Sequence, residues 1–193
     1  MPVESLLKKI RACDHCSAHL PHKPNPVIRA HQDARIIVIG QAPGTRVHKT
    51  GIPWNDPSGQ LLRQWMEVDD ETFYDVTKIA LVPMGFCYPG KGTSGDLPPR
   101  TECAPLWHEK VFSKIKQAKI TLLIGQYSQG YYLGERKSKT LAETVRNFRA
   151  HLPAYFTLPH PSPRNRLWLR KNAWFEKEVV PELRKHVRRA LRT

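Results

Sequence analysis

The sequence predicts an α/β protein, namely a single-domain α/β/α sandwich around a central, mostly parallel, four-stranded sheet. Two observations carry this prediction. Short β-branched apolar runs alternate with segments of helical pattern, which is typical of parallel sheets covered by helices. The chain has 193 residues, a length that fits one domain. We therefore expect residues 1–193 to form a single unit, with an N-terminal helix and cysteine loop over 1–33 and a basic C-terminal helix over 164–193.

The expected strands are apolar runs, two of which are followed directly by glycine. They cover residues 34–39, 79–82, 120–124 and 155–158. Helical patterns cover residues 4–12, 58–66, 104–118, the stretch from Tyr127 onward and residues 172–191, where Pro181 is expected to produce a kink. Ligands of parallel sheets bind outside the carboxyl ends of the strands. The site is therefore expected in the four loops that follow these strands.

The charge of the chain is its most unusual property. Thirty-one Lys and Arg against seventeen Asp and Glu give a net charge of +14. This balance favours a polyanionic partner, nucleic acid before membrane. No apolar run approaches the roughly 20 residues that cross a bilayer, and the N-terminus lacks the apolar core and cleavage site of a secretory signal. We therefore expect a cytoplasmic protein that binds nucleic acid and no membrane.

The loop after the first expected strand consists mainly of small residues, Gly40-Gln41-Ala42-Pro43-Gly44. Small residues directly after a buried strand let a ligand approach the backbone closely. The segment that follows contains Trp54 and Asn55 and leads into the helix expected at 58–66. A plain strand-to-helix turn, with Asp56 or Ser58 capping that helix, explains the same residues without a ligand.

The loop after the last expected strand reads His160-Pro161-Ser162-Pro163-Arg164-Asn165. Its prolines hold the histidine stiffly at a strand end, where the imidazole is placed to donate a hydrogen bond to a developing anion. A surface histidine in a turn is the alternative. Between residues 164 and 193, ten Lys or Arg stand against three Glu, a local excess of seven. About half of the net charge therefore follows this loop directly.

The chain has four cysteines. Cys13 and Cys16 form a C-x2-C pair near the N-terminus, and Cys87 and Cys103 follow with fifteen residues between them. Thiols stay reduced in the cytosol, so disulfides are not expected there. Four thiolates are a complete ligand set for an iron–sulfur cluster or a structural zinc ion. Four unrelated thiols are the alternative.

Taken in chain order, GQAPG, the G-x-P-W and SGQLL segments and HPSPRN resemble the uracil-DNA glycosylase superfamily. The likeness is greatest to its iron–sulfur branch, family four, in which a GEAPG segment and an HPS segment form the two motifs. The resemblance covers roughly residues 10 to 185 and includes the order of the cysteines. It implies a 4Fe-4S cluster of structural role on Cys13, Cys16, Cys87 and Cys103, with zinc as the lesser alternative.

The resemblance implies a DNA repair glycosylase, which hydrolyses the N-glycosidic bond of uracil or another damaged or modified base flipped out of DNA. His160 would hydrogen-bond a carbonyl oxygen of the leaving base, and Trp54 would stack on that base. The loop Gly40, Gln41, Ala42, Pro43 and Gly44 would line the base edge and position water. Phosphate would be held by Pro161, Ser162 and Pro163, and the duplex would be invaded by Arg164, Asn165, Arg166 and Leu167.

The chain departs from the family pattern at three places. Gln41 stands where family four has glutamate, so Asp56 becomes the candidate for holding water or opposing the sugar cation. Residues 81–86 lack the asparagine that reads uracil in the family, and Asn55 is the candidate substitute. The stretch 88–100 differs from the family loop and adds Asp96 and Arg100 as polar candidates. The target base is therefore open.

The missing glutamate and asparagine motivate an alternative function. It is a catalytically weak or inactive glycosylase-like protein that binds damaged or single-stranded DNA without turnover. In both cases DNA is the expected partner. No obligate protein partner is evident in the sequence, and we expect a monomer.

Overall fold

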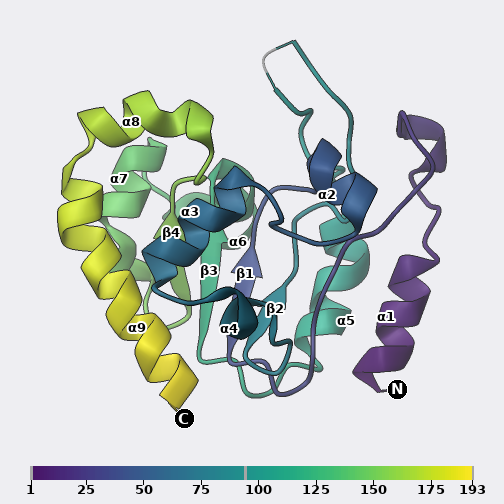
Figure 1. Ribbon diagram of the computed structural model, residues 1–193, viewed down its shortest axis with the longest axis horizontal. Helices are drawn as coiled ribbons and strands as arrows, with labels where there is room; N and C mark the ends of the chain where they lie inside the picture. The colour runs from purple at the N-terminus through teal and green to yellow at the C-terminus, as the bar shows by residue number, and fades with distance from the viewer. Residues whose placement is uncertain (1, 94, 193) are drawn as a thin grey trace.

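The computed structural model describes residues 2–93 and 95–192, which form an α/β/α sandwich (Figure 1). The sheet of this described part has four strands, all parallel, in the order β2-β1-β3-β4. The strands are β1 (Ile36–Ile39), β2 (Ile79–Leu81), β3 (Ile120–Ile124) and β4 (Tyr155–Leu158). The predicted fold class is confirmed, and each strand lies within the run that predicted it.

Each face of the sheet has its own core. Ile36 and Val38 of β1 pack into one core, whereas Ile37 and Ile39 pack into the other, because successive strand residues point to opposite faces. The first face is covered by α3 (Pro57–Met66), α4 (Asp70–Tyr74), α7 (Leu141–Arg146) and α9 (Val180–Arg192). The second face is covered by α1 (Val3–Arg11), α5 (Glu109–Phe112) and α6 (Gln126–Leu133).

Four short helices were not predicted as separate elements. They are α2 (Thr45–Thr50), α4, α7 and α8 (Arg166–Lys171), of which α8 lies within the stretch 164–193 that was expected to form one basic helix. None exceeds six residues, which is too short for a hydrophobic period to show. Two of them carry capping residues that the sequence displays: the Asp69 side chain caps α4, and Thr140 and Glu143 form a capping box at α7.

The two longest expected helices differ from the prediction in detail. The helix expected over 104–118 ends at Phe112, and the one expected over 172–191 begins at Phe175. Each opens with a wide π-helical segment, Ala104–His108 before α5 and Phe175–Val179 before α9. Pro181 lies just after the second of these segments, where its missing N–H removes a regular helical hydrogen bond. The expected kink therefore takes the form of a widened turn.

The loops after the strands project from one end of the molecule, at the top of Figure 1. There lie α2, α8 and a hairpin that we call the 90–97 hairpin, formed by residues 90–93 and 95–97. From α8 the chain turns into α9, which leads to the opposite end of the molecule. Across residues 2–93 and 95–192, the helices are all too short or too polar to cross a bilayer.

Candidate active site

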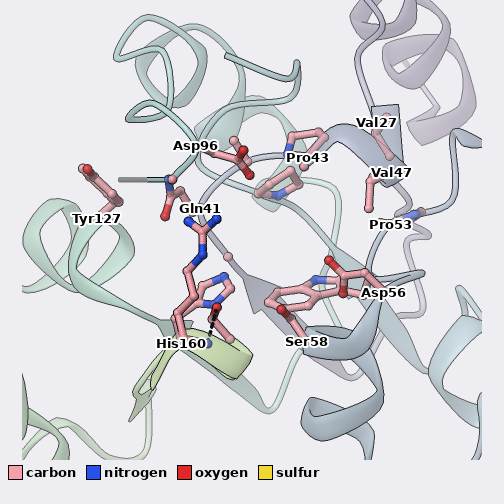
Figure 2. Close-up of a pocket in the computed structure, with 18 of the residues that line it drawn as sticks. Val27, Gln41, Pro43, Val47, Pro53, Asp56, Ser58, Asp96, Tyr127 and His160 are labelled. Atoms are coloured by element: carbon pink, nitrogen blue, oxygen red, sulfur yellow. Dashed lines mark hydrogen bonds between the residues drawn. The ribbon is translucent and has the colours of Figure 1, made fainter. Parts of the chain in front are cut away.

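A cavity of about 510 Å³ opens at the carboxyl ends of the strands (Figure 2). This volume is within the range of roughly 300–1,000 Å³ that is usual for small-molecule sites. Loops after β1, β3 and β4 line it together with the start of α3 and the 90–97 hairpin. The predicted site residues that line it are Gly40, Gln41, Ala42, Pro43, Gly44, Trp54, Asp56, His160, Ser162, Arg164 and Asn165.

His160 and Trp54 form the aromatic wall of this cavity. Their ring centroids lie 5.7 Å apart with 28° between the planes, a stacked arrangement. Burial lowers the pKa of His160, and the nearby Asp56 carboxylate opposes that shift only in part. The imidazole is therefore neutral at neutral pH. The backbone carbonyl of His160 accepts a hydrogen bond of 2.7 Å from Asn165 Nδ2, which fixes the loop that carries the ring.

Trp54 is held in a strained backbone conformation. Its φ is +59°, in the left-handed region that residues other than glycine rarely adopt. Two glycines make room for it: a Cβ on Gly40 would lie 2.6 Å from the indole Cζ2, and a Cβ on Gly59 would collide with the Trp54 carbonyl oxygen. Such strain persists where surrounding contacts impose it, and it gathers at functional sites.

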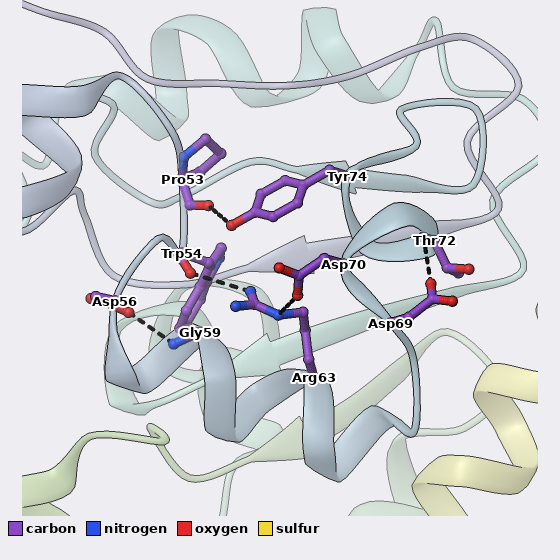
Figure 3. A network of polar contacts seen from close by, with 9 residues as sticks. All are labelled: Pro53, Trp54, Asp56, Gly59, Arg63, Asp69, Asp70, Thr72 and Tyr74. Atoms are coloured by element: carbon purple, nitrogen blue, oxygen red, sulfur yellow. Dashed lines mark hydrogen bonds and ion pairs between the residues drawn. The ribbon is translucent and has the colours of Figure 1, made fainter.

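Those surrounding contacts come from α3 and α4 (Figure 3). The Arg63 guanidinium donates to the Trp54 carbonyl oxygen at 3.3 Å, and the Tyr74 hydroxyl donates to the Pro53 carbonyl oxygen at 3.1 Å. Arg63 is itself held by Asp70, with Nε 2.6 Å from Oδ1, and it lies over the ring of Tyr74. A buried cation thus fixes the peptide that presents the indole to the cavity.

Asp56 performs the capping role that the sequence allowed. Its Oδ1 accepts a hydrogen bond of 2.8 Å from the Gly59 backbone N–H at the start of α3. The same residue lines the cavity and influences the pKa of His160. The cap therefore fixes the orientation of a carboxylate that lines the cavity.

Gln41 serves a purpose that the sequence did not reveal. Its side-chain Nε2 donates to the Leu97 carbonyl oxygen at 3.2 Å. The backbone carbonyl oxygen of Gln41 accepts a hydrogen bond from the Gly85 backbone N–H at 3.0 Å. The first bond ties the loop after β1 to the 90–97 hairpin. An ionised glutamate has no proton to donate there, so the carboxamide suits this contact.

The remaining predicted residues lie beside the cavity. Asn55 follows Trp54 in the chain, but it is not among the described residues that line the cavity. The same is true of Pro161, Pro163, Arg166 and Leu167. Pro161 is buried, whereas the other three are exposed at the rim, where a large ligand would meet them.

Several lining residues were missed by sequence reasoning. Gln126 and Tyr127 come directly after the Gly125 that ends β3, so the rule about strand ends could have found them. Gly95 reaches the cavity through the hairpin, which no local pattern predicts, whereas its neighbour Asp96, which also lines the cavity, was among the polar candidates. The other residues in this group are Val27, Val47, Pro53, Ser58 and Pro83.

The four cysteines line one small enclosure that is separate from the cavity. Its other walls are apolar or aromatic, apart from Arg100. Burial raises the pKa of the Cys103 thiol to about 12 and that of Cys87 to about 11. Arg100 pairs with Glu102 beside these thiols, and its buried Nε has no hydrogen-bond partner among the described residues. Within residues 2–93 and 95–192, no three His, Cys, Asp or Glu are arranged to hold a metal ion.

The basic C-terminal region divides into two parts. Arg166 lies at the start of α8, near the cavity, and is exposed. In α9, by contrast, Arg184 donates to the carbonyl oxygens of Gln64 and Trp65 at the end of α3, and Arg188 pairs with Glu67 at 3.0 Å. Much of the charge on α9 thus serves the packing of α9 against the end of α3.

Comparison with known families gives one match. The model of the Uracil DNA glycosylase superfamily matches residues 28–184 of this chain. The matched segment runs from just before β1 into α9 and includes both loops that build the cavity. It begins after Cys13 and Cys16, so the family match does not include the first pair of cysteines.

Proposed function

The chain belongs to the uracil-DNA glycosylase superfamily, and on that premise we propose that it is a monofunctional DNA glycosylase. Its substrate is uracil or another damaged or modified base that is flipped out of DNA. The observation that carries the proposal is the stacked pair of Trp54 and a neutral His160 in a cavity at the carboxyl ends of the strands.

Hydrolysis breaks the bond between C1′ of the deoxyribose and the base. The hydroxyl of water joins C1′, and the base departs with the electron pair and takes up the proton. Negative charge therefore grows on a carbonyl oxygen of the base, where an N–H of neutral His160 can donate to it. Trp54 offers a flat apolar surface for the extruded ring, held in place through the Arg63 contact.

Positive charge grows on the sugar in the same step. Asp56 is the lining carboxylate nearest to this role, because it lies close enough to His160 to affect its pKa and is oriented by the Gly59 N–H. It would oppose the sugar cation and orient the attacking water. No lysine is among the described residues that line the cavity, so attack by water fits the site better than imine formation.

The test is a panel of oligonucleotides that carry uracil, hypoxanthine, xanthine or hydroxymethyluracil, in single and double strands. Strand breaks should appear only after alkali treatment, because the enzyme releases the base and leaves the backbone intact. Release of a base at an undiminished rate in the His160→Ala variant would refute the catalytic assignment. Tight, salt-dependent binding without release from any substrate would favour a DNA-binding protein without turnover.

We also propose that the cysteine enclosure holds a structural 4Fe-4S cluster. All four cysteines line it, although no three of these described residues are close enough together to hold a single metal ion, and its other walls, mostly apolar with one arginine, suit a buried anionic group. A single zinc ion would need every sulfur about 2.3 Å from one point. A cluster binds each sulfur to a different iron and accepts a wider arrangement. When bound, it would join the N-terminal segment to the loop after β2.

Protein purified without oxygen tests this second proposal. It should be brown, absorb broadly in the violet and blue, and contain iron, and Cys103→Ser should reduce the iron content and the stability. Stoichiometric zinc without iron would show that the enclosure holds a zinc ion and no cluster. A metal-free protein with four freely reactive thiols would refute both.

A further inference from the structure

Two exposed leucines stand beside the mouth of the cavity. Leu97 is 44% exposed and directly follows the lining residue Asp96. Leu167 is 61% exposed and lies two residues after the lining residue Asn165. One leucine belongs to the 90–97 hairpin and the other to α8, and both elements project beyond the carboxyl ends of the strands (Figure 1).

The backbone of Leu97 is fixed although its side chain is exposed. Its N–H donates to the Gly90 carbonyl oxygen at 2.8 Å, and its carbonyl accepts the 3.2 Å hydrogen bond from Gln41. The side chain lies across Gly90 and Gly92, where an added Cβ would approach it to 3.4 and 3.3 Å. The hairpin therefore presents the apolar Leu97 side chain on a fixed backbone. Gly90 and Gly92 have no side chains that would cover it.

The two leucine-bearing loops meet each other over the cavity. The guanidinium of Arg164 lies so close to Gly95 that a Cβ on this glycine would collide with Nη1. Asp96 of the hairpin and His160 of the loop after β4 both line this cavity (Figure 2). Leu97 and Leu167 thus lie in two segments that touch each other beside the cavity.

We propose that Leu97 is a second wedge, which enters the base stack of duplex DNA on the side of the flipped nucleotide opposite to Leu167. This inference rests on the proposed function and names double-stranded DNA as the partner. A flipped nucleotide leaves a gap in the stack, and apolar side chains that fill such gaps keep the neighbouring bases apart. Exposed Lys91 in the hairpin and Arg166 in α8 supply positive charge beside each leucine for the adjoining phosphates.

The experiment uses a duplex that contains a tetrahydrofuran abasic-site analogue, so it does not depend on the target base. A fluorescent 2-aminopurine is placed on either the 5′ or the 3′ side of the analogue, and its fluorescence rises when it is unstacked. The wild-type protein should raise the fluorescence at both positions. Leu97→Ala should abolish the rise on one side and Leu167→Ala the rise on the other. Each variant should weaken duplex binding by about tenfold and single-strand binding by less than about twofold.

Leu97→Met is the matched control, because it keeps an apolar side chain of similar reach and should behave like the wild type. Thermal unfolding of Leu97→Ala, measured in parallel, separates a lost wedge from a collapsed hairpin. A variant as stable as the wild type that still unstacks both neighbours would overturn the second wedge. Equal losses on single strands and duplex would overturn it as well. Base release from the panel above is scored separately, so the glycosylase proposal can stand when this inference fails.

Discussion

Two histidines, one buried in the core and one partly buried in the cavity wall, show how differently one residue type is used in this molecule. His108 lies under the second face of the sheet, where Nε2 bonds to the Pro83 carbonyl oxygen at 3.0 Å and Nδ1 to the Tyr132 hydroxyl. His160 stands in the cavity, and no described residue hydrogen-bonds to its ring. Burial lowers the pKa of both. The difference is that the protein itself satisfies His108, whereas His160 keeps its hydrogen-bonding capacity for a ligand.

The comparison teaches that a lowered pKa alone does not identify a catalytic group. Structural networks produce the same shift, and only the direction of the ring nitrogens separates the two cases. The contacts of His108 also reach the site indirectly, because Pro83 lines the cavity. His108 is therefore a structural support beneath the site, and His160 is the histidine that lines the cavity.

The largest expected effect concerns His160. His160→Ala should reduce base release about 10²- to 10³-fold, because it removes a donor aimed at the developing negative charge. Single-turnover kinetics on the preferred substrate of the panel measure this loss. His160→Gln, which keeps a donor of similar reach, should recover part of it. The melting temperature should change little in either variant, so a large fall in stability would assign His160 to the structural class instead.

His108 should affect stability and its pH dependence. Burial holds its pKa at about 4, below the 6.5 of an unfolded histidine. The resulting contribution to the free energy of unfolding is complete above pH 6.5 and is lost as the pH falls towards 4. In this range the unfolded chain binds a proton at the histidine, whereas the folded chain keeps it neutral. The lowered pKa of His108 contributes about 3 kcal/mol to the free energy of unfolding above this range. Urea unfolding across this window should show a shallower pH dependence for His108→Gln than for the wild type.

The Arg63 contact should matter for the chemistry of the site at a distance. Arg63→Met frees the Trp54 carbonyl and should lower kcat/KM about tenfold, because the indole loses its fixed position. Asp70→Asn is the matched control. This variant weakens the same ion pair at the Asp70 side chain, which is 76% exposed, and should lower kcat/KM less than about twofold. Equal effects of the two variants would show that the ion pair, and not the carbonyl contact, carries the result.

The smallest expected effect concerns the salt dependence of DNA binding. Arg166→Ala should reduce the slope of log K against log salt by about 0.9 if one phosphate contact is lost. Arg188→Ala should leave the slope unchanged, since Arg188 pairs with Glu67 far from the cavity. Fluorescence anisotropy at several salt concentrations measures both. A change of slope in the Arg188 variant alone would place the DNA on the opposite end of the molecule.

The sequence was most informative where a pattern is local. The runs at residues 120–124 and 155–158 predicted β3 and β4 with their observed bounds, because consecutive apolar residues are a direct mark of a buried strand. The small residues directly after β1 likewise predicted the part of the cavity between Gly40 and Gly44 from a local pattern. The Gln41 contact with Leu97 escaped prediction, because it joins residues 56 positions apart. The strained backbone of Trp54 also depends on Arg63 and Tyr74, whose roles no motif records.

The division of positive charge between the two ends of the molecule has a consequence for how the protein finds its target. Cations of α9 that are engaged with Glu67 and Glu182 attract a distant polyanion weakly. Arg166 lies at the end where the cavity opens and is exposed. Phosphate that arrives at this end therefore meets a cation whose charge is not balanced by an ion pair among the described residues, whereas on α9 it would have to compete with Glu67 and Glu182.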